Sequence, residues 1–243
     1  MVQLRTGYLS DMGLIRKRNE DAYLVQLSRE IKILAVADGM GGHQGGHIAS
    51  RLALEIIDAY SFKKNTMQED MEKAILEANE KIKSRAMADP GLEGMGTTLT
   101  LLGINERKGL VAHVGDSRCY LFREGRLERV TRDHSLVEEM VRQGKLTSEE
   151  AATHPQRNVV LQALGLEEKP EIEFYELQFK KGDILLLCTD GLTGLVGEEE
   201  ISEMLIEQKD LQQMAQKMVE KANAQGGHDN ITVVLCSFEE EQP

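Results

Sequence analysis

Four aspartates share one local pattern, in which the acid stands beside glycine or another small residue at the end of an apolar run. They are Asp38 in VADG, Asp116 in VGDS, Asp190 in CTDG and Asp229 in GGHDN. Carboxylates gathered where strands end must either repel one another or share cations, and oxygen ligands suit magnesium and manganese. The sequence contains neither HExxH nor a CxxC pair, so zinc is not expected, and the EF-hand pattern DxDxDG is also missing.

A fifth cluster of charged residues lies between the first two strand-like runs, in the segment DMGLIRKRNED. It contains Asp11, Arg16, Glu20 and Asp21. Aspartate next to glycine is also ordinary turn chemistry, and any one aspartate taken alone is better explained as a turn residue. The whole set favours a metal centre, in which Gly39 would let a backbone carbonyl approach an ion.

Strand-like runs alternate with amphipathic helices along the chain. Strands are expected at 3–9, 22–27, 31–37, 97–104, 110–114, 118–122, 127–130, 171–177, 183–188 and 231–238, and helices at 46–60, 67–88, 198–208 and 211–224. Thr66 and Glu69 form a capping-box pattern, and Gly226 and Gly227 predict a left-handed end for the last helix. Several connections are too short for parallel crossovers, so the pattern predicts antiparallel strands in an α+β layered sandwich.

Composition limits the classes of function. The 243 residues are 41% apolar, enough for one large core, so a single domain is expected over 1–243. The net charge of −12 argues against binding to nucleic acid, and no run approaches the length of a membrane span. The three cysteines lie in apolar runs and predict buried thiols in the reducing cytoplasm. No coiled-coil seam is visible, so a monomer is expected.

The order of the motifs resembles that of bacterial metal-dependent serine/threonine protein phosphatases, the PPM or type 2C family. The motifs are DMGLIRKRNED, VADGMGGH, GTTL, VGDSRCYL, TRDHS, RNVVLQALG, LCTDGLTGLV and GGHDNITVVL. Together they cover essentially the whole chain. The resemblance implies a sandwich of two antiparallel β-sheets flanked by pairs of α-helices, with a two-metal centre at one edge.

The resemblance also implies roles for the residues of the metal centre. Asp38 would bridge two Mn²⁺ or Mg²⁺ ions, while Asp190 and Asp229 complete one ion site. The Gly39 carbonyl would serve the other ion. A water between the ions would be deprotonated and attack phosphorus in line, so that no nucleophilic side chain is needed.

Further residues are assigned by the same resemblance. Glu20 and Asp21 would hold metal-bound waters, and Asn230 would position the neighbouring aspartate. Asp116 and Asp190 together resemble the third, weaker divalent-ion site of bacterial members.

Arg16 is expected to clamp the phosphate, because its guanidinium fork matches two phosphate oxygens and it begins the family's RxxNED pattern. Lys17 and Arg18 are interpreted as solvated. His43 in DGMGGH is the candidate acid for the leaving alkoxide. Eukaryotic members have histidine directly after DG, where this chain has Met40, so a metal-bound water is the alternative acid.

Residues 135–157 are expected to form an inserted flap over the site, where substrate preference is set. The resulting interpretation is a protein phosphatase for phosphoserine and phosphothreonine, with phosphorylated proteins as substrates and serine/threonine kinases as counterparts. A catalytically silent adaptor of the same fold would be expected to lack a bridging acid. Another alternative is a metal-dependent phosphodiesterase or small-molecule phosphatase. His113 and His134 are expected to be structural.

Overall fold

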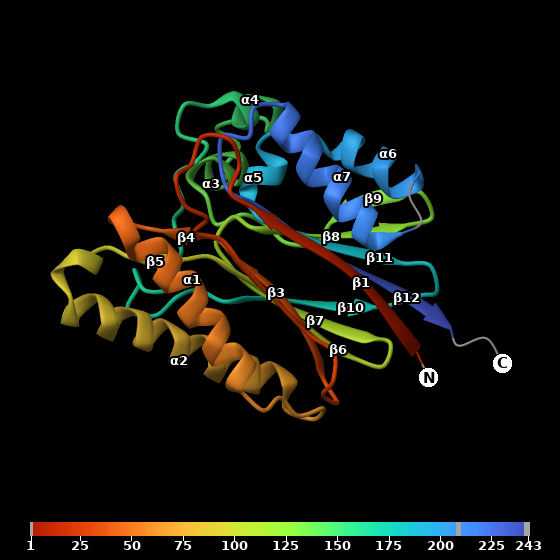
Figure 1. Cartoon of the computed structure of the whole chain (residues 1–243), viewed down its shortest axis with the longest axis horizontal. Coiled ribbons are helices and arrows are strands. Elements are labelled where there is room, and N and C mark those ends of the chain that lie inside the picture. Colours follow the sequence, from red (N-terminus) through yellow and green to blue (C-terminus); the bar gives the residue numbers. More distant parts are fainter. Residues whose placement is uncertain (1, 208–209, 241–243) are drawn as a thin grey trace.

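The computed structural model describes residues 2–207 and 210–240, without the side chains of residues 2–3, 42–44 and 240 (Figure 1). Two five-stranded antiparallel sheets account for most of the described strands. The first sheet consists, in order, of β1 (Val2–Asp11), β12 (Ile231–Glu240), β11 (Ile184–Cys188), β8 (Arg118–Arg123) and β9 (Arg126–Arg129). The second consists of β10 (Glu173–Gln178), β7 (Lys108–Val114), β6 (Leu99–Asn105), β3 (Lys32–Ala37) and β2 (Ala22–Gln26).

Pairs of helices cover the outer faces of the two sheets (Figure 1). The helices α1 (Gly42–Ala59) and α2 (Met67–Ala88) pack on the sheet that contains β3. The helices α6 (Glu198–Glu207) and α7 (Leu211–Ala224) pack on the sheet that contains β12. A third apolar cluster fills the space between the sheets. The order of layers is therefore helix, sheet, sheet, helix, and the predicted sandwich is confirmed.

The strand β3 shows why central strands are continuous apolar runs in this fold. Ile33 and Ala35 face the helices α1 and α2, whereas Leu34 and Val36 face the other sheet. Alternate side chains of a strand point to opposite faces, so a strand buried on both faces needs apolar residues at every position. Polar residues can begin only where the strand reaches the edge of the sandwich, at Asp38.

Most predicted elements are confirmed, and the short ones were missed. The missed elements are β4 (Gly39–Met40), β5 (Gly96–Thr97), the 3-10 helix η1 (Pro90–Leu92) and α5 (Asp190–Thr193). These pieces are too short to show a periodic pattern. The helix α1 also begins at Gly42 rather than at residue 46, because its first turn is glycine-rich and carries little helical signal.

The segment predicted as a flap contains two short helices, α3 (Leu136–Arg142) and α4 (Ser148–Thr153). Figure 1 places them with α5 at one end of the sandwich. Ser135 and Val160 pair as an isolated antiparallel bridge, so the segment leaves and returns at neighbouring points. Thr147 and Glu150 form a capping box at the start of α4.

The predicted left-handed end of the last helix is confirmed. Gly226 and Gly227 both have positive φ, at 125° and 51°. Their backbone N–H groups donate to Asn223 O at 3.0 Å and Ala222 O at 3.1 Å, which is the hydrogen-bond pattern of a Schellman motif. Cys119, Cys188 and Cys236 are buried free thiols, as predicted. Among the described helices, none has the length and apolar character required to cross a bilayer.

The predicted capping box at Thr66 and Glu69 is wrong. Thr66 makes no side-chain cap hydrogen bond, and Glu69 is exposed. Asp70 is buried instead, and its Oδ2 accepts hydrogen bonds from the Lys63 backbone N–H at 3.0 Å and the Thr66 hydroxyl at 2.8 Å. The sequence pattern missed this arrangement because Lys63 lies outside the helix.

Replacing Asp70 by alanine should therefore destabilise the protein, whereas replacing Glu69 should not. Asp70→Ala removes the acceptor of two half-buried hydrogen bonds, from the Lys63 N–H and the Thr66 hydroxyl, so the free energy of unfolding should fall by about 2 kcal/mol. Glu69→Ala, on the exposed face, should change it by about 0.5 kcal/mol or less. Urea unfolding of both variants measures the difference. Equal losses would contradict the role assigned to Asp70.

Candidate metal centre

The four strand-end aspartates lie together in one cavity of about 240 Å³. The cavity is lined by Arg16, Glu20, Asp38, Gly39, Met40, Gly41, Asp116, Asn158, Val160, Asp190, Asp229 and Asn230. The structure thus brings together nearly all of the residues that the sequence singled out. Of the predicted positions with a described side chain, Asp21 is not part of this lining.

Strand direction explains the convergence. Asp38 follows β3, and Asp190 follows β11. Asp116 precedes β8, and Asp229 precedes β12. Because β11 is antiparallel to β8 and to β12, its carboxyl end lies beside the amino ends of both neighbours, with Cys188 opposite Arg118 and Val233. Residues far apart in the chain therefore share one edge of the sandwich.

Each of these carboxylates makes the ionised form of its neighbours less stable. Asp116 is buried, and Asp38 and Asp190 are half-buried. Loss of hydration raises the pKa of all three, and neighbouring negative charges raise it further. For Asp38 the largest contribution from a neighbouring charge comes from Asp21, and for Asp116 it comes from Asp190. A cation placed among these groups would remove a repulsion that the fold otherwise retains.

Arg16 reaches into the cavity from the loop after β1. Its Nη2 donates to Asp229 Oδ2 at 2.6 Å, and its side chain is half exposed. Burial works against the guanidinium charge, but the hydrogen bond and the charge of Asp229 raise the pKa of Arg16. Lys17 and Arg18 are exposed and do not line the cavity, as predicted.

Asp21 lies behind the cavity rather than in it. Its Oδ2 accepts hydrogen bonds from the hydroxyls of Thr189 and Thr232, both at 2.7 Å, while Oδ1 is buried with no hydrogen-bond partner in the described structure. Burial raises the pKa of Asp21 to about 7, and the two hydroxyls oppose this shift.

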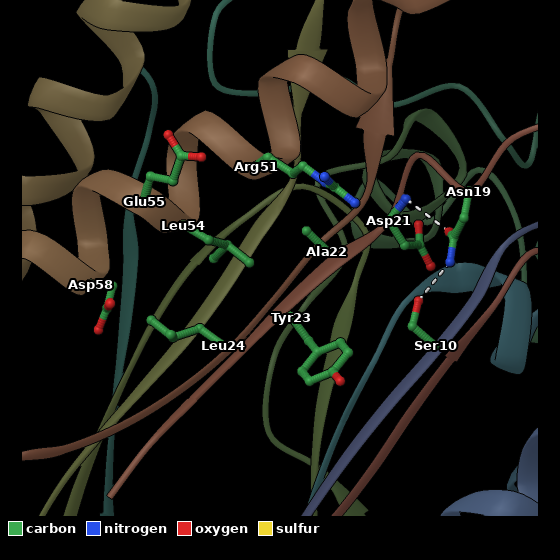
Figure 2. A pocket seen from close by; sticks show the side chains of 10 residues that line it. All are labelled: Ser10, Asn19, Asp21, Ala22, Tyr23, Leu24, Arg51, Leu54, Glu55 and Asp58. Atoms are coloured by element: carbon green, nitrogen blue, oxygen red, sulfur yellow. Dashed lines mark hydrogen bonds between the residues drawn. The ribbon is translucent and has the colours of Figure 1, made fainter. Parts of the chain in front are cut away.

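Figure 2 shows Asp21 from a groove between β2 and α1, where Asn19 accepts a hydrogen bond from its backbone N–H. Asn19 in turn donates to the Ser10 hydroxyl at 2.8 Å. Asp21 is thus held by a direct hydrogen bond from Thr232 of β12 and, through Asn19, by a link to Ser10 of β1.

Gly39 is required by close backbone packing. A Cβ at this position would lie 2.1 Å from the carbonyl oxygen of Gly46 in α1 and 2.6 Å from the carbonyl oxygen of Glu20. Both neighbours are backbone atoms, so neither can move aside as a side chain would. The tight contact joins α1 to the end of β3. It also joins the end of β3 to the loop of residues 12–21, which carries Glu20 and Asp21 and is called the acidic loop below.

Two threonines hold the peptide of Asp38, a role that the sequence analysis missed. The Asp38 carbonyl accepts hydrogen bonds from the Thr98 N–H and the Thr97 hydroxyl, both at 2.9 Å. The Asp38 N–H donates to the Thr98 hydroxyl at 2.9 Å. These threonines form the centre of the GTTL motif. That motif is the only feature of the sequence that could have indicated their role.

Asn230 ties the acidic loop to the cavity. Its side-chain Oδ1 accepts from the Glu20 N–H at 2.8 Å, and its Nδ2 donates to the carbonyls of Met12 and Arg18, both at 2.9 Å. Its backbone N–H donates to Asp229 Oδ1 at 2.8 Å. The loop that carries Arg16 is therefore closed at both ends by one side chain.

The loop before Asp116 is fixed by His134. The His134 N–H donates to the Gly115 carbonyl at 2.7 Å, and its Nδ1 accepts from the Gly115 N–H at 3.3 Å. His113 packs against this ring with centroids 5.0 Å apart, and burial lowers the pKa of His113 to about 4. The surroundings of both histidines are those of structural residues. His43 belongs to the first turn of α1, but its side chain lies outside the described part of the structure.

The residues present fit a divalent cation in the chemistry of their donors. The cavity contains carboxylate oxygens, and Asp190 Oδ1 is buried with no hydrogen-bond partner in the described structure. Among the described residues, however, no group of three or more His, Cys, Asp or Glu side chains is arranged so that it could hold one metal ion. The assignment of individual ligands therefore stays a prediction.

Comparison with known proteins identifies the family. The family model described as protein phosphatase 2C matches residues 16–236. The chain belongs to the protein phosphatase 2C family. A relative from Listeria monocytogenes, named serine/threonine phosphatase stp, is 41% identical over 96% of this chain and 95% of its own length.

Solved structures of serine/threonine phosphatases share this fold. A serine/threonine phosphatase from S. agalactiae matches with a TM-score of 0.92 and 35% identity, over 98% of this chain and 100% of that one. The catalytic domain of PstP in complex with 2 manganese ions matches with a TM-score of 0.87 and 34% identity, over 99% and 100% of the two chains. The predicted family, fold and phosphatase class are confirmed.

In this protein phosphatase 2C member, Gly39→Ala should disturb both fold and site. The added methyl group would overlap the Gly46 carbonyl, and relieving that overlap should lower the free energy of unfolding by about 2 kcal/mol or more. Gly197→Ala is a suitable control, because the nearest atom to its Cβ is Glu200 Oε2 at 4.0 Å. Thermal unfolding compares the two variants. A Gly39→Ala protein as stable as Gly197→Ala would contradict the packing argument.

Proposed function

We propose that this chain is a metal-dependent protein phosphatase that hydrolyses phosphoserine and phosphothreonine in other proteins. The observation that carries the proposal is the open cavity in which Arg16 lies beside a cluster of buried and half-buried aspartates. Such a cavity offers a cationic group for the phosphate next to ligands for the ions. The silent adaptor is not favoured, because Asp38, Asp190 and Asp229 are all present in the cavity.

The ligand set proposed for the ions consists only of oxygen atoms. Asp38, Asp190, Asp229 and the Gly39 carbonyl would hold two Mn²⁺ or Mg²⁺ ions, and Asp116 with Asp190 would hold a third. When bound, the ions would supply a water of lowered pKa as the nucleophile. Glu20 and Asp21 would orient waters around them, Glu20 from inside the cavity and Asp21 from behind it.

Arg16 would bind and orient the phosphate. One of its five N–H donors already contacts Asp229, and the planar fork leaves the others for phosphate oxygens. The contact with Asp229 also holds the guanidinium in place before the substrate arrives, so less side-chain entropy is lost on binding. For the leaving alkoxide, His43 and a water at the ions are the two candidate acids.

The remaining assignments extend the same proposal. The chain would act as a single catalytic domain and as a monomer, with residues 135–157 as the flap. The substrates would be proteins phosphorylated by serine/threonine kinases. A cytoplasmic location is supported by three buried free cysteines, since such thiols suit a reducing compartment.

Phosphate release from a phosphothreonine peptide, titrated with Mn²⁺, tests the proposal. Turnover should require the metal, and Asp190→Asn should reduce kcat/KM by at least about 100-fold at a fixed Mn²⁺ concentration. Asp58→Asn, which changes an acid on α1 outside the cavity, is the matched control and should keep wild-type activity. Release in the presence of a chelator, or full activity of Asp190→Asn, would overturn the proposal.

Arg16→Ala should raise KM more than it lowers kcat, because contact with the phosphate in the ground state is the main loss. An increase in KM of about 10-fold is expected from the removal of a charge-assisted hydrogen bond. Lys17→Ala removes a neighbouring charge outside the cavity and should leave KM unchanged. Steady-state kinetics on the same peptide separate the two parameters. An equal increase in KM in both variants would show that the positive charge of the loop, and not a specific contact of Arg16, binds the phosphate.

A further inference from the structure

The loop that carries Arg16 also presents aliphatic side chains to solvent. Leu14 is 66% exposed and Ile15 is 64% exposed. Single exposed apolar residues are common on protein surfaces and need no explanation. Two consecutive ones directly before the proposed phosphate clamp are different, because in the chain they adjoin the residue at which a substrate phosphate would bind.

The backbone of this loop is fixed, so the exposure is built into the structure. Asn230 binds the carbonyls on both sides of the pair, at Met12 and Arg18. The Leu14 N–H donates to the Gly227 carbonyl at 2.8 Å. Gly13 has a φ of +75°, and a Cβ there would lie 2.2 Å from the Asp229 carbonyl oxygen. The loop is therefore locked against the segment that carries Asp229.

A second apolar wall comes from the segment after α4. Val160 lines the cavity and pairs with Ser135 in an isolated antiparallel bridge. This segment is fixed as well, because Leu161 N–H donates to the His134 carbonyl at 2.7 Å and Leu136 N–H donates to the Val159 carbonyl at 2.9 Å. The acidic cavity thus has aliphatic residues on two of the segments that form its wall. We call Leu14, Ile15 and Val160 the apolar rim.

We propose that the apolar rim binds apolar side chains that flank the phosphorylated residue, so that this phosphatase prefers phosphosites with aliphatic or aromatic neighbours. The inference rests on the proposed function and specifies its substrate class. An extended peptide advances about 3.5 Å per residue. A phosphate held at Arg16 therefore places the next one or two side chains within reach of the residues directly before Arg16 in the chain.

Burial of apolar surface favours the same type of substrate. Apolar residues beside the phosphosite would be removed from water against the rim. Discrimination of roughly 10-fold per flanking position is the usual size of such an apolar contact.

Two phosphothreonine peptides of equal length test the proposal, one with leucine and one with glutamate on both sides of the phosphorylated residue. The readout is the ratio of kcat/KM for the two peptides at saturating Mn²⁺, with p-nitrophenyl phosphate as a substrate that lacks flanking residues. The wild type should prefer the leucine peptide by at least about 10-fold. The double variant Leu14→Ser, Ile15→Ser should reduce this preference to about 3-fold or less.

Two further variants complete the design. Ile206→Ser changes an equally exposed isoleucine on α6, outside the cavity, and should keep the wild-type preference. Ile15→Lys adds a charge to the rim and should raise kcat/KM for the glutamate peptide above the wild-type value. Misfolding would lower kcat/KM for every substrate, so it cannot produce this gain.

A wild type that hydrolyses both peptides equally would overturn the apolar rim and leave the proposed function intact. A preference that survives in Leu14→Ser, Ile15→Ser and in Val160→Ser would overturn it as well. A wild type that releases phosphate from neither the peptides nor p-nitrophenyl phosphate would contradict the proposed function itself.

Discussion

Mutual repulsion among carboxylates at one edge of the sandwich is the constraint on which the rest of the structure depends. Burial and neighbouring charges raise the pKa of Asp38, Asp116 and Asp190, so their ionised forms weaken the folded state near neutral pH. The three apolar clusters between the four layers offset this cost. A divalent cation bound at this edge would relieve the same repulsion, so the feature that weakens the fold is also the one on which the proposed metal chemistry rests.

Repelling groups stay together only when their backbones are held firmly. Thr97 and Thr98 bind both sides of the Asp38 peptide, and Asn230 binds the acidic loop at three backbone atoms. Arg16 supplies a positive charge to Asp229. Each of these contacts joins segments that are far apart in sequence. The site is thus a property of the whole sandwich, and the rigid loop around Arg16 presents the apolar rim as a consequence.

Local patterns in the sequence were sufficient to predict the longer strands and the strand-end aspartates, and the resemblance to a known family supplied the four layers. They could not show that adjacent Glu20 and Asp21 separate, one into the cavity and one behind it, because this depends on how the chain enters β2. The partners of Thr98 and Asp70 were also missed, since a hydroxyl or carboxylate does not reveal which backbone it will meet. The helix α5 has four residues and no periodicity to detect. Sequence therefore predicts where polar groups gather, and the structure is needed to show what holds them.

The most direct test of the central claim is the thermal unfolding of wild type and Asp38→Asn, each with Mn²⁺ and with a chelator, at pH 7.5. Asparagine has the shape of aspartate without its charge. Because the folded-state pKa of Asp38 is raised, its ionised form is destabilising above the ordinary aspartate pKa, and this effect is lost in the variant. We predict that Asp38→Asn is more stable than wild type in chelator and that Mn²⁺ stabilises the wild type far more than the variant. A variant that is less stable in chelator and gains equally from Mn²⁺ would contradict the account.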